Sequence, residues 1–334
     1  RLLVRELKAD DRVSLVVYAG ASGVVLEPTA GDKTATITAA LDALTAAGST
    51  NGGAGIKMAY ALAQQAYIKD GINRVILATD GDFNVGTVDF EMLKQLVEER
   101  REQGIGLTTL GFGTGNYNDH LMEQLADAGN GNYAYIDTLS EARKALIDEM
   151  SSTLMTIAKD VKIQVEFNPA TVAEYRLIGY ENRALAREDF SNDRVDAGEI
   201  GAGHSVTAIY EIALTGSAGQ RLDDGRYQQA HTSKTRSGEL GVVKLRYKQP
   251  GGDRSTLTEQ VVRKVDIVQA LDETSEAYRF AAAVAGLGQV LRGGKYTGDF
   301  GYTEVLVLAR GARGDDPFGY RGEFLQLTNL AASL

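Results

Sequence analysis

Two short segments carry side chains that can bind a hard metal ion. Residues 48–52 read Gly-Ser-Thr-Asn-Gly and stand just before an expected helix, which places the hydroxyl of Thr50 in a loop. Residues 75–84 read VILATDGDFN, so Asp80 follows directly on an apolar stretch. Mg²⁺ prefers oxygen ligands, and a hydroxyl binds it without cancelling its charge. Thr50 and Asp80 therefore carry side-chain oxygens of the kind that such an ion binds. Three further residues are predicted to shape the same loops: Asn51, Asp82 and Asn84.

The same two residues also have simpler interpretations. Thr50 has the side chain expected of a residue that caps the following helix. Asp80 suits a turn at the end of a strand, before Gly81. The metal-site interpretation depends on finding both residues in this order, one before a helix and one after a buried strand.

The spacing of Asp80 and Asp82 also permits a phosphatase. It imitates the Asp-x-Asp of haloacid-dehalogenase-type phosphatases, in which the first Asp attacks phosphate and the second acts as an acid. Residues 314–316, Gly-Asp-Asp, would then be the later acidic motif. However, that family places its nucleophile after the first strand, whereas several expected elements precede Asp80. The phosphatase remains an alternative to the binding site.

Other motifs give weaker signals. The glycines of residues 111–115 lack the spacing of a dinucleotide-binding loop, which favours an ordinary loop. Residues 313–315 spell Arg-Gly-Asp, an integrin-binding tripeptide that arises easily by chance. The three histidines are far apart in the chain, so no zinc cluster is expected. They are His120, His204 and His231.

Residues 1–158 alternate between expected strands and helices, which indicates a parallel sheet with helices on both faces. Residues 1–7 also carry a helical period. The expected strands are residues 13–18, 23–26, 74–78, 105–110 and 132–136. The expected helices are residues 34–44, 55–67, 90–103, 119–128 and 139–158.

The pattern changes near Lys159 to alternating polar and apolar residues, typical of half-buried antiparallel strands. We expect strands at residues 162–167, 173–177, 205–213, 242–247 and 259–268. Helices are expected at residues 277–291, 302–309 and 320–334. The chain is therefore predicted to have three parts: an α/β domain over 1–158, a β-sandwich-like region over 159–270, and a helical region over 271–334.

Residues 48–52 and 75–84, with one helix between them, resemble the von Willebrand factor A (vWA) domain. Residues 175–183 and 196–204 look like the C-terminal region of one bacterial subfamily of these proteins. The resemblance implies a doubly wound, mostly parallel, Rossmann-like sheet. It also implies a metal-ion-dependent adhesion site (MIDAS), formed by an Asp-x-Ser-x-Ser loop, a Thr at position 50 and an Asp at position 80.

The chain departs from this pattern at its start, because no Asp-x-Ser-x-Ser precedes Val13. In the family that loop follows the first strand, which lies in the middle of the sheet. We therefore expect the first strand to be absent here. The strands at 13–18 and 74–78 would then have unpaired backbone groups, each costing about 1–3 kcal/mol when buried. Metal binding by this chain is expected to be weak.

The resemblance implies a binding module rather than an enzyme. A carboxylate from a protein partner would complete the coordination of Mg²⁺, or of Ca²⁺ or Mn²⁺. Members of the subfamily are often predicted lipoproteins, which implies a location in the periplasm or on the cell envelope. A structural envelope protein with an idle metal site is a further alternative.

Charge and composition narrow the classes of partner. The net charge is −10 and the pI is about 5.0, which argues against nucleic acid. The absence of cysteine excludes disulfides and thiolate metal sites in this stretch. No apolar segment reaches the roughly 20 residues that a membrane-spanning helix needs. Nothing in the sequence indicates the oligomeric state.

Overall fold

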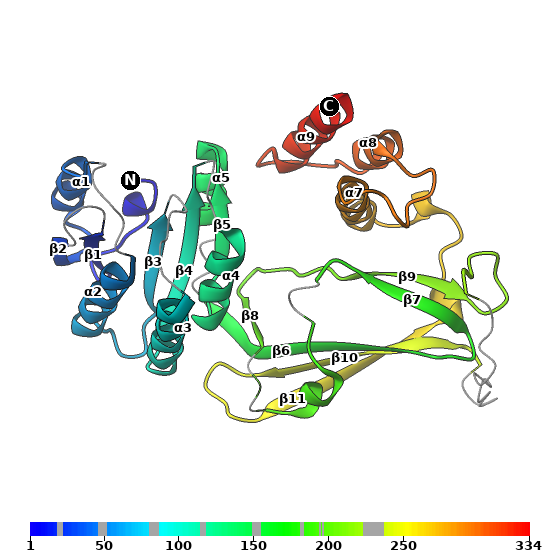
Figure 1. The fold of residues 1–334 in the computed structure, drawn as a ribbon, viewed down its shortest axis with the longest axis horizontal. Helices are drawn as coiled ribbons and strands as arrows, with labels where there is room; N and C mark the ends of the chain where they lie inside the picture. Colours follow the sequence, from blue (N-terminus) through cyan, green and yellow to red (C-terminus); the bar gives the residue numbers. More distant parts are fainter. Residues whose placement is uncertain are drawn as a thin grey trace. The chain divides into compact units, whose positions relative to one another are not determined.

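The computed structural model describes residues 1–18, 23–45, 52–79, 87–113, 118–148, 155–180, 184–193, 195, 197–222 and 237–334. The chain divides into two compact units (Figure 1). The first contains residues 1–162, 194–204 and 247–255, and the second contains residues 163–193, 205–246 and 256–334.

Three parallel strands form the centre of the first unit, side by side in the order β3 (Asn73–Thr79), β4 (Ile105–Phe112) and β5 (Tyr133–Ile136) (Figure 1). A separate antiparallel hairpin is formed by β1 (Arg12–Val17) and β2 (Gly23–Ala30). These elements confirm the five strands expected in this region. Among the described residues, β1 and β3 belong to different sheets and are not paired with each other.

The helices of the first unit are α1 (Thr34–Asp42), α2 (Gly52–Gln65), α3 (Thr87–Glu102), α4 (Asp119–Ala128) and α5 (Leu139–Arg143). Their positions confirm the expected alternation of strands and helices. The helical period at the amino terminus gives only a 3-10 turn, Leu3–Arg5, which has no side-chain cap and buries only Val4.

The expected helix over 139–158 is wrong at its described carboxyl end, residues 155–158. A π-helical turn, Lys144–Asp148, follows α5, and Thr156 already lies in a strand. That strand is β6 (Thr156–Phe167), and Thr156 pairs with Gly201 on another strand. Pairing with a distant segment therefore overrides the local helical pattern.

The core of the first unit lies between the parallel sheet and helices α2, α3 and α4. Val75 and Leu77 of β3 are buried in this core, whereas Ile76 between them is 41% exposed. β4 is buried along most of its length. The three helices therefore cover the face that Val75 and Leu77 share with Ile105 and Leu107, and among the described residues the other face of β3 is open at Ile76.

Two antiparallel sheets follow the α/β part. One has the strand order β11 (Ser255–Arg263), β10 (Glu239–Lys248), β6 and β8 (Gly198–Gly201). The other pairs β7 (Val172–Ile178) with β9 (Ile209–Leu214). The ring of Phe167 lies 4.6 Å from that of Tyr175 and 5.4 Å from that of Tyr210, so aromatic side chains join the two sheets.

Two of the expected strands fall short of their expected range at one end. The strand expected over 259–268 ends at Arg263, because a 3-10 turn, Lys264–Asp266, follows it. The carboxylate of Asp266 accepts the backbone amide of Arg263 at 2.7 Å, which fixes this turn. The strand expected from 205 begins only at Ile209.

The last part of the chain forms three helices: α7 (Glu276–Leu291), α8 (Tyr302–Gly311) and α9 (Tyr320–Ser333). They confirm the helices expected there. Their buried core consists of helix residues alone: Ala283, Leu287, Val305 and Ala309. No helix in the described ranges is both long and apolar enough to cross a membrane.

The first unit contains a buried tyrosine, Tyr60, whose hydroxyl group can be tested by substitution. Tyr60 on α2 is 1% exposed, and its hydroxyl has no hydrogen-bond partner among the described residues. Burial raises the pKa of Tyr60 above its ordinary value, and the nearby positive charges of Arg100 and Arg74 only partly offset this effect.

We expect Tyr60→Phe to leave the free energy of unfolding unchanged at neutral pH or to raise it by about 1 kcal/mol, because an unsatisfied buried donor is removed. The raised pKa of Tyr60 contributes stability that is fully present below its unfolded-state pKa of about 10. This stability is lost as the pH rises through the higher pKa of the folded state. Denaturant unfolding between neutral and alkaline pH should therefore show a shallower alkaline decline for Tyr60→Phe. The exposed Tyr67→Phe is the control, and a marked loss of stability in Tyr60→Phe would contradict the argument.

Candidate functional site

The predicted site residues lie outside the residues that the structure describes. This holds for both predicted ligands, Thr50 and Asp80, and for the neighbouring loop residues Asn51, Asp82 and Asn84. The structure describes the elements that stand next to them in the sequence, α2 and β3. α2 begins at Gly52, close behind Thr50, and β3 ends at Thr79, immediately before Asp80.

The parallel register fixes the edge of the sheet at which Asp80 follows β3. Thr79 of β3 pairs with Gly111 of β4, and Phe112 of β4 pairs with Ile136 of β5. The carboxyl ends of the three strands therefore meet at one edge. In open α/β sheets, ligands bind just beyond this edge.

One tyrosine connects the start of α2 to the end of β3. Gly55 of α2 is buried so closely against Tyr18 that a Cβ at position 55 would lie 2.5 Å from the Cβ of Tyr18. The hydroxyl of Tyr18 donates a hydrogen bond to the carbonyl oxygen of Ala78. The first turn of α2 and the end of β3 thus contact one side chain, Tyr18.

The start of α2 lacks a carboxylate that would attract a cation. The N-terminus of a helix carries a partial positive charge, which repels a cation. The first turn of α2 contains no acidic residue that would offset this charge. A cation near Thr50 would therefore depend on carboxylates, of which Asp80 is the predicted one.

No alternative metal cluster is found in the part of the chain that the structure describes, where no group of three or more His, Cys, Asp or Glu residues could hold an ion. The ring of His120 shares a hydrogen bond of 2.8 Å with Gln124. The backbone amide of His204 donates to Gly201, and His231 lies outside the described residues.

The later acidic motif of the phosphatase alternative has a structural role at α9. The carboxylate of Asp316 accepts the backbone amides of Gly322 at 2.8 Å and Arg321 at 3.1 Å, and it lies 3.5 Å from the guanidinium of Arg313. Burial raises the pKa of Asp316, but these donors outweigh it and hold the pKa below its ordinary value. Arg313, which is the Arg of the Arg-Gly-Asp tripeptide, is thus paired with Asp316.

A buried polar cluster at the opposite end of the sheet was not predicted. Arg74, near the start of β3, donates to Thr108 at 2.9 Å and to the carbonyl oxygen of Asn130 at 3.2 Å. The amide of Asn130 donates to the carboxylate of Glu199 on β8 at 2.8 Å. Burial lowers the pKa of Arg74, and the negative charge of Glu199 partly offsets this. The only signal in the sequence was an arginine at the start of an apolar strand.

Two family models match consecutive parts of the chain. Residues 2–149 match the von Willebrand factor type A domain, and residues 152–334 match the family described as "Uncharacterized protein YfbK, C-terminal". The chain belongs to this family of vWA proteins with a YfbK-type C-terminal region. The resemblance inferred from the sequence is thereby confirmed.

The chain is similar to two curated proteins. It is 48% identical over 335 residues to "Uncharacterized protein YfbK" of Escherichia coli (strain K12), covering 99% of this chain and 57% of that protein. It is 28% identical over 159 residues to "Uncharacterized protein sll0103" of Synechocystis, covering 47% of this chain and 37% of that protein. The chain therefore spans little more than half the length of the first relative.

Solved structures show a weaker likeness. The structure "von Willebrand factor type A from Catenulispora acidiphila" has 17% identity and a TM-score of 0.47, over 98% of this chain and 75% of that one. The SpRpn10 VWA domain has 14% identity and a TM-score of 0.35, over 45% of this chain and 77% of that one. The fold assignment rests on the family matches and the strand order.

The contact between Gly55 and Tyr18 can be tested directly. We expect Gly55→Ala to lower the free energy of unfolding by about 1–3 kcal/mol, because the new methyl group overlaps the Tyr18 side chain. Gly53→Ala is the matched control in the same helix, since a Cβ there would meet nothing within 4 Å. The control should be neutral or slightly stabilising. Urea unfolding of both variants checks this, and equal stability of the two would refute the close packing.

Proposed function

We propose that this chain is part of a metal-assisted protein-binding module. Thr50 and Asp80 contribute oxygen ligands to a divalent cation, Mg²⁺ or alternatively Ca²⁺ or Mn²⁺, and a carboxylate of a protein partner completes the coordination. Membership of the vWA family supports an interaction or adhesion role. The observation that carries the proposal is the bridge from Gly55 through Tyr18 to Ala78, beside the two ligand-bearing loops.

The two residues have different tasks in this proposal. The carboxylate of Asp80 supplies the negative charge that offsets the positive start of α2. The hydroxyl of Thr50 is neutral, so it holds the ion without reducing its attraction for another carboxylate. When bound, the cation supplies an electrophilic coordination position for the partner.

Two ligands are too few for tight binding, because Mg²⁺ takes about six oxygen ligands in near-octahedral geometry. We propose that an Asp-x-Ser-x-Ser loop, supplied by sequence upstream of Arg1, provides the remaining protein ligands. This proposal is supported by the strand order, in which β1 and β3 of the described residues are not hydrogen-bonded to each other.

We also propose an extracytoplasmic location, in the periplasm or on the cell envelope, with a lipid anchor on the whole protein. This rests on the resemblance to a subfamily of predicted lipoproteins. Cell fractionation of the whole protein, with globomycin to block lipoprotein processing, tests it. Recovery in the cytoplasmic fraction would refute it.

The first functional prediction concerns metal affinity. Isothermal titration of this chain with MgCl₂ should give weak binding or none, whereas the whole protein with its upstream residues should bind well, because more oxygen ligands are then present. Tight binding by residues 1–334 alone would show that the missing loop is not needed.

The second functional prediction concerns the partner. In the whole protein, Thr50→Ala with Asp80→Ala should abolish Mg²⁺-dependent recovery of a protein partner in a pull-down, while thermal unfolding stays cooperative. Asp70→Asn, a change at an exposed residue shortly before β3, is the matched control and should bind normally. Unchanged recovery by the double variant would favour an idle metal site. Magnesium-dependent phosphate-ester hydrolysis that is lost in Asp80→Asn would favour the phosphatase instead.

A further inference from the structure

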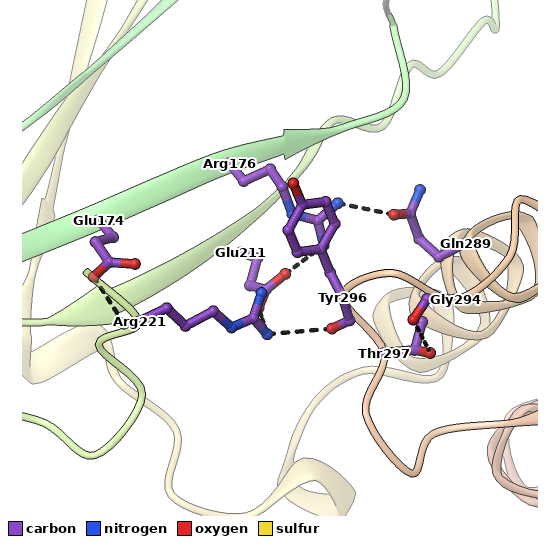
Figure 2. Close-up of polar contacts among 8 residues, drawn as sticks. All are labelled: Glu174, Arg176, Glu211, Arg221, Gln289, Gly294, Tyr296 and Thr297. Atoms are coloured by element: carbon purple, nitrogen blue, oxygen red, sulfur yellow. Dashed lines mark hydrogen bonds and ion pairs between the residues drawn. The ribbon is translucent and has the colours of Figure 1, made fainter.

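A cluster of charged side chains joins the helices α7–α9 to the hairpin of β7 and β9 (Figure 2). At its centre is Glu211 of β9, whose carboxylate pairs with Arg176 of β7 and, at 3.0 Å, with Arg221. Arg176 also donates to the side chain of Gln289 on α7 at 2.8 Å. Arg221 donates to the backbone carbonyl of Tyr296, in the loop between α7 and α8, at 3.2 Å.

The ring of Tyr296 lies between the cations of this cluster, as Figure 2 shows for the two arginines. The ring centre is 4.3 Å from the guanidinium carbon of Arg176 and 5.5 Å from that of Arg221. The amine of Lys295 lies 5.0 Å from the same ring. Cation–π attraction therefore adds to the ion pairs at one point of the helical loop.

The hairpin holds the arginines in place. Arg176 and Glu211 are directly opposite in the register of β7 and β9. Glu174, two residues earlier on the same face of β7, accepts the backbone amides of Arg221 at 2.9 Å and Leu222 at 2.8 Å. The segment that carries Arg221 is thereby fixed to the strand.

The helical side of the contact is set by a tight turn. Gly293 and Gly294 have φ values of 93° and 63°, which favour glycine. The carbonyl oxygen of Gly294 accepts the hydroxyl of Thr297 at 3.1 Å, which closes the turn around Tyr296 (Figure 2).

The contact is polar and partly solvent-exposed, whereas the helices have an apolar core of their own. The side chains of Arg176, Glu211 and Arg221 are 27%, 39% and 50% exposed. Salt weakens ion pairs of this kind far more than it weakens apolar packing. The four buried core residues of α7 and α8, by contrast, lie only on helices. The helices can therefore leave the hairpin without losing their core.

We infer that Glu211, Arg176, Arg221 and Tyr296 form an ionic latch, which docks α7–α9 on the β7–β9 hairpin as one movable body. Opening the latch changes the position of the helices and leaves their structure intact. This inference is independent of the metal site, because it uses no residue of that site.

The absence of cysteine allows a direct test in the full chain. Spin labels are placed on Ala218→Cys, in the turn after β9, and on Thr303→Cys, at the start of α8; both positions are exposed. The distance distribution between the labels should be narrow at low salt and should broaden at 1 M NaCl, which screens charges beyond about 3 Å. Glu211→Gln should broaden it already at low salt. Far-UV circular dichroism should show unchanged helix content in both cases.

Glu166→Gln is the matched control. It removes a partly exposed ion pair with Lys244, 3.0 Å long, that joins β6 to β10 and involves no helix. This variant should keep the narrow distribution at low salt. A distribution that stays narrow in high salt and in Glu211→Gln would overturn the latch. Loss of helix content together with broadening would also overturn it, because the helices would then depend on docking. The salt titration of the labelled chain gives an answer even if Glu211→Gln fails to fold.

Discussion

The close packing of Gly55 on Tyr18 is the constraint on which the candidate site depends. Only glycine permits this approach, since any Cβ at position 55 would overlap the tyrosine. The Tyr18 hydroxyl then reaches the carbonyl oxygen of Ala78, at the end of β3. The start of α2 and the end of β3 thus contact the same side chain, and in the sequence Thr50 stands just before the first and Asp80 just after the second.

Much of the α/β part could be predicted from the sequence because its signals are local. Apolar stretches such as residues 74–78 specify buried strands, and the loop signals around them set the order of elements. The two predicted ligands came from the resemblance to the vWA domain, since a Thr before a helix and an Asp after a strand also permit a helix cap and a turn. What failed was non-local: Thr156 lies in a strand because it pairs with Gly201, and no local pattern records that pairing. The cluster of Arg74 with Glu199 was missed for the same reason.

The two ends of the parallel sheet differ. At the amino end, Arg74 is partly buried among hydrogen-bond acceptors and lies near the carboxylate of Glu199 on β8, and burial lowers its pKa. The carboxyl ends of β3, β4 and β5 meet at the opposite edge, which is where ligands bind in open α/β sheets. The metal site that we propose would use this second edge.

This contrast extends to the region that follows the vWA domain. Residues 152–334 contribute β8 to the first unit and α7–α9 to the second. β8 is joined through Glu199 and Asn130 to Arg74, a partly buried arginine whose pKa is lowered by burial. The helices are joined through Glu211 to arginines whose side chains are 27% and 50% exposed, so water can replace a broken contact at little cost. The same family region therefore combines an attachment to the parallel sheet with the attachment of its helices that we infer to be releasable.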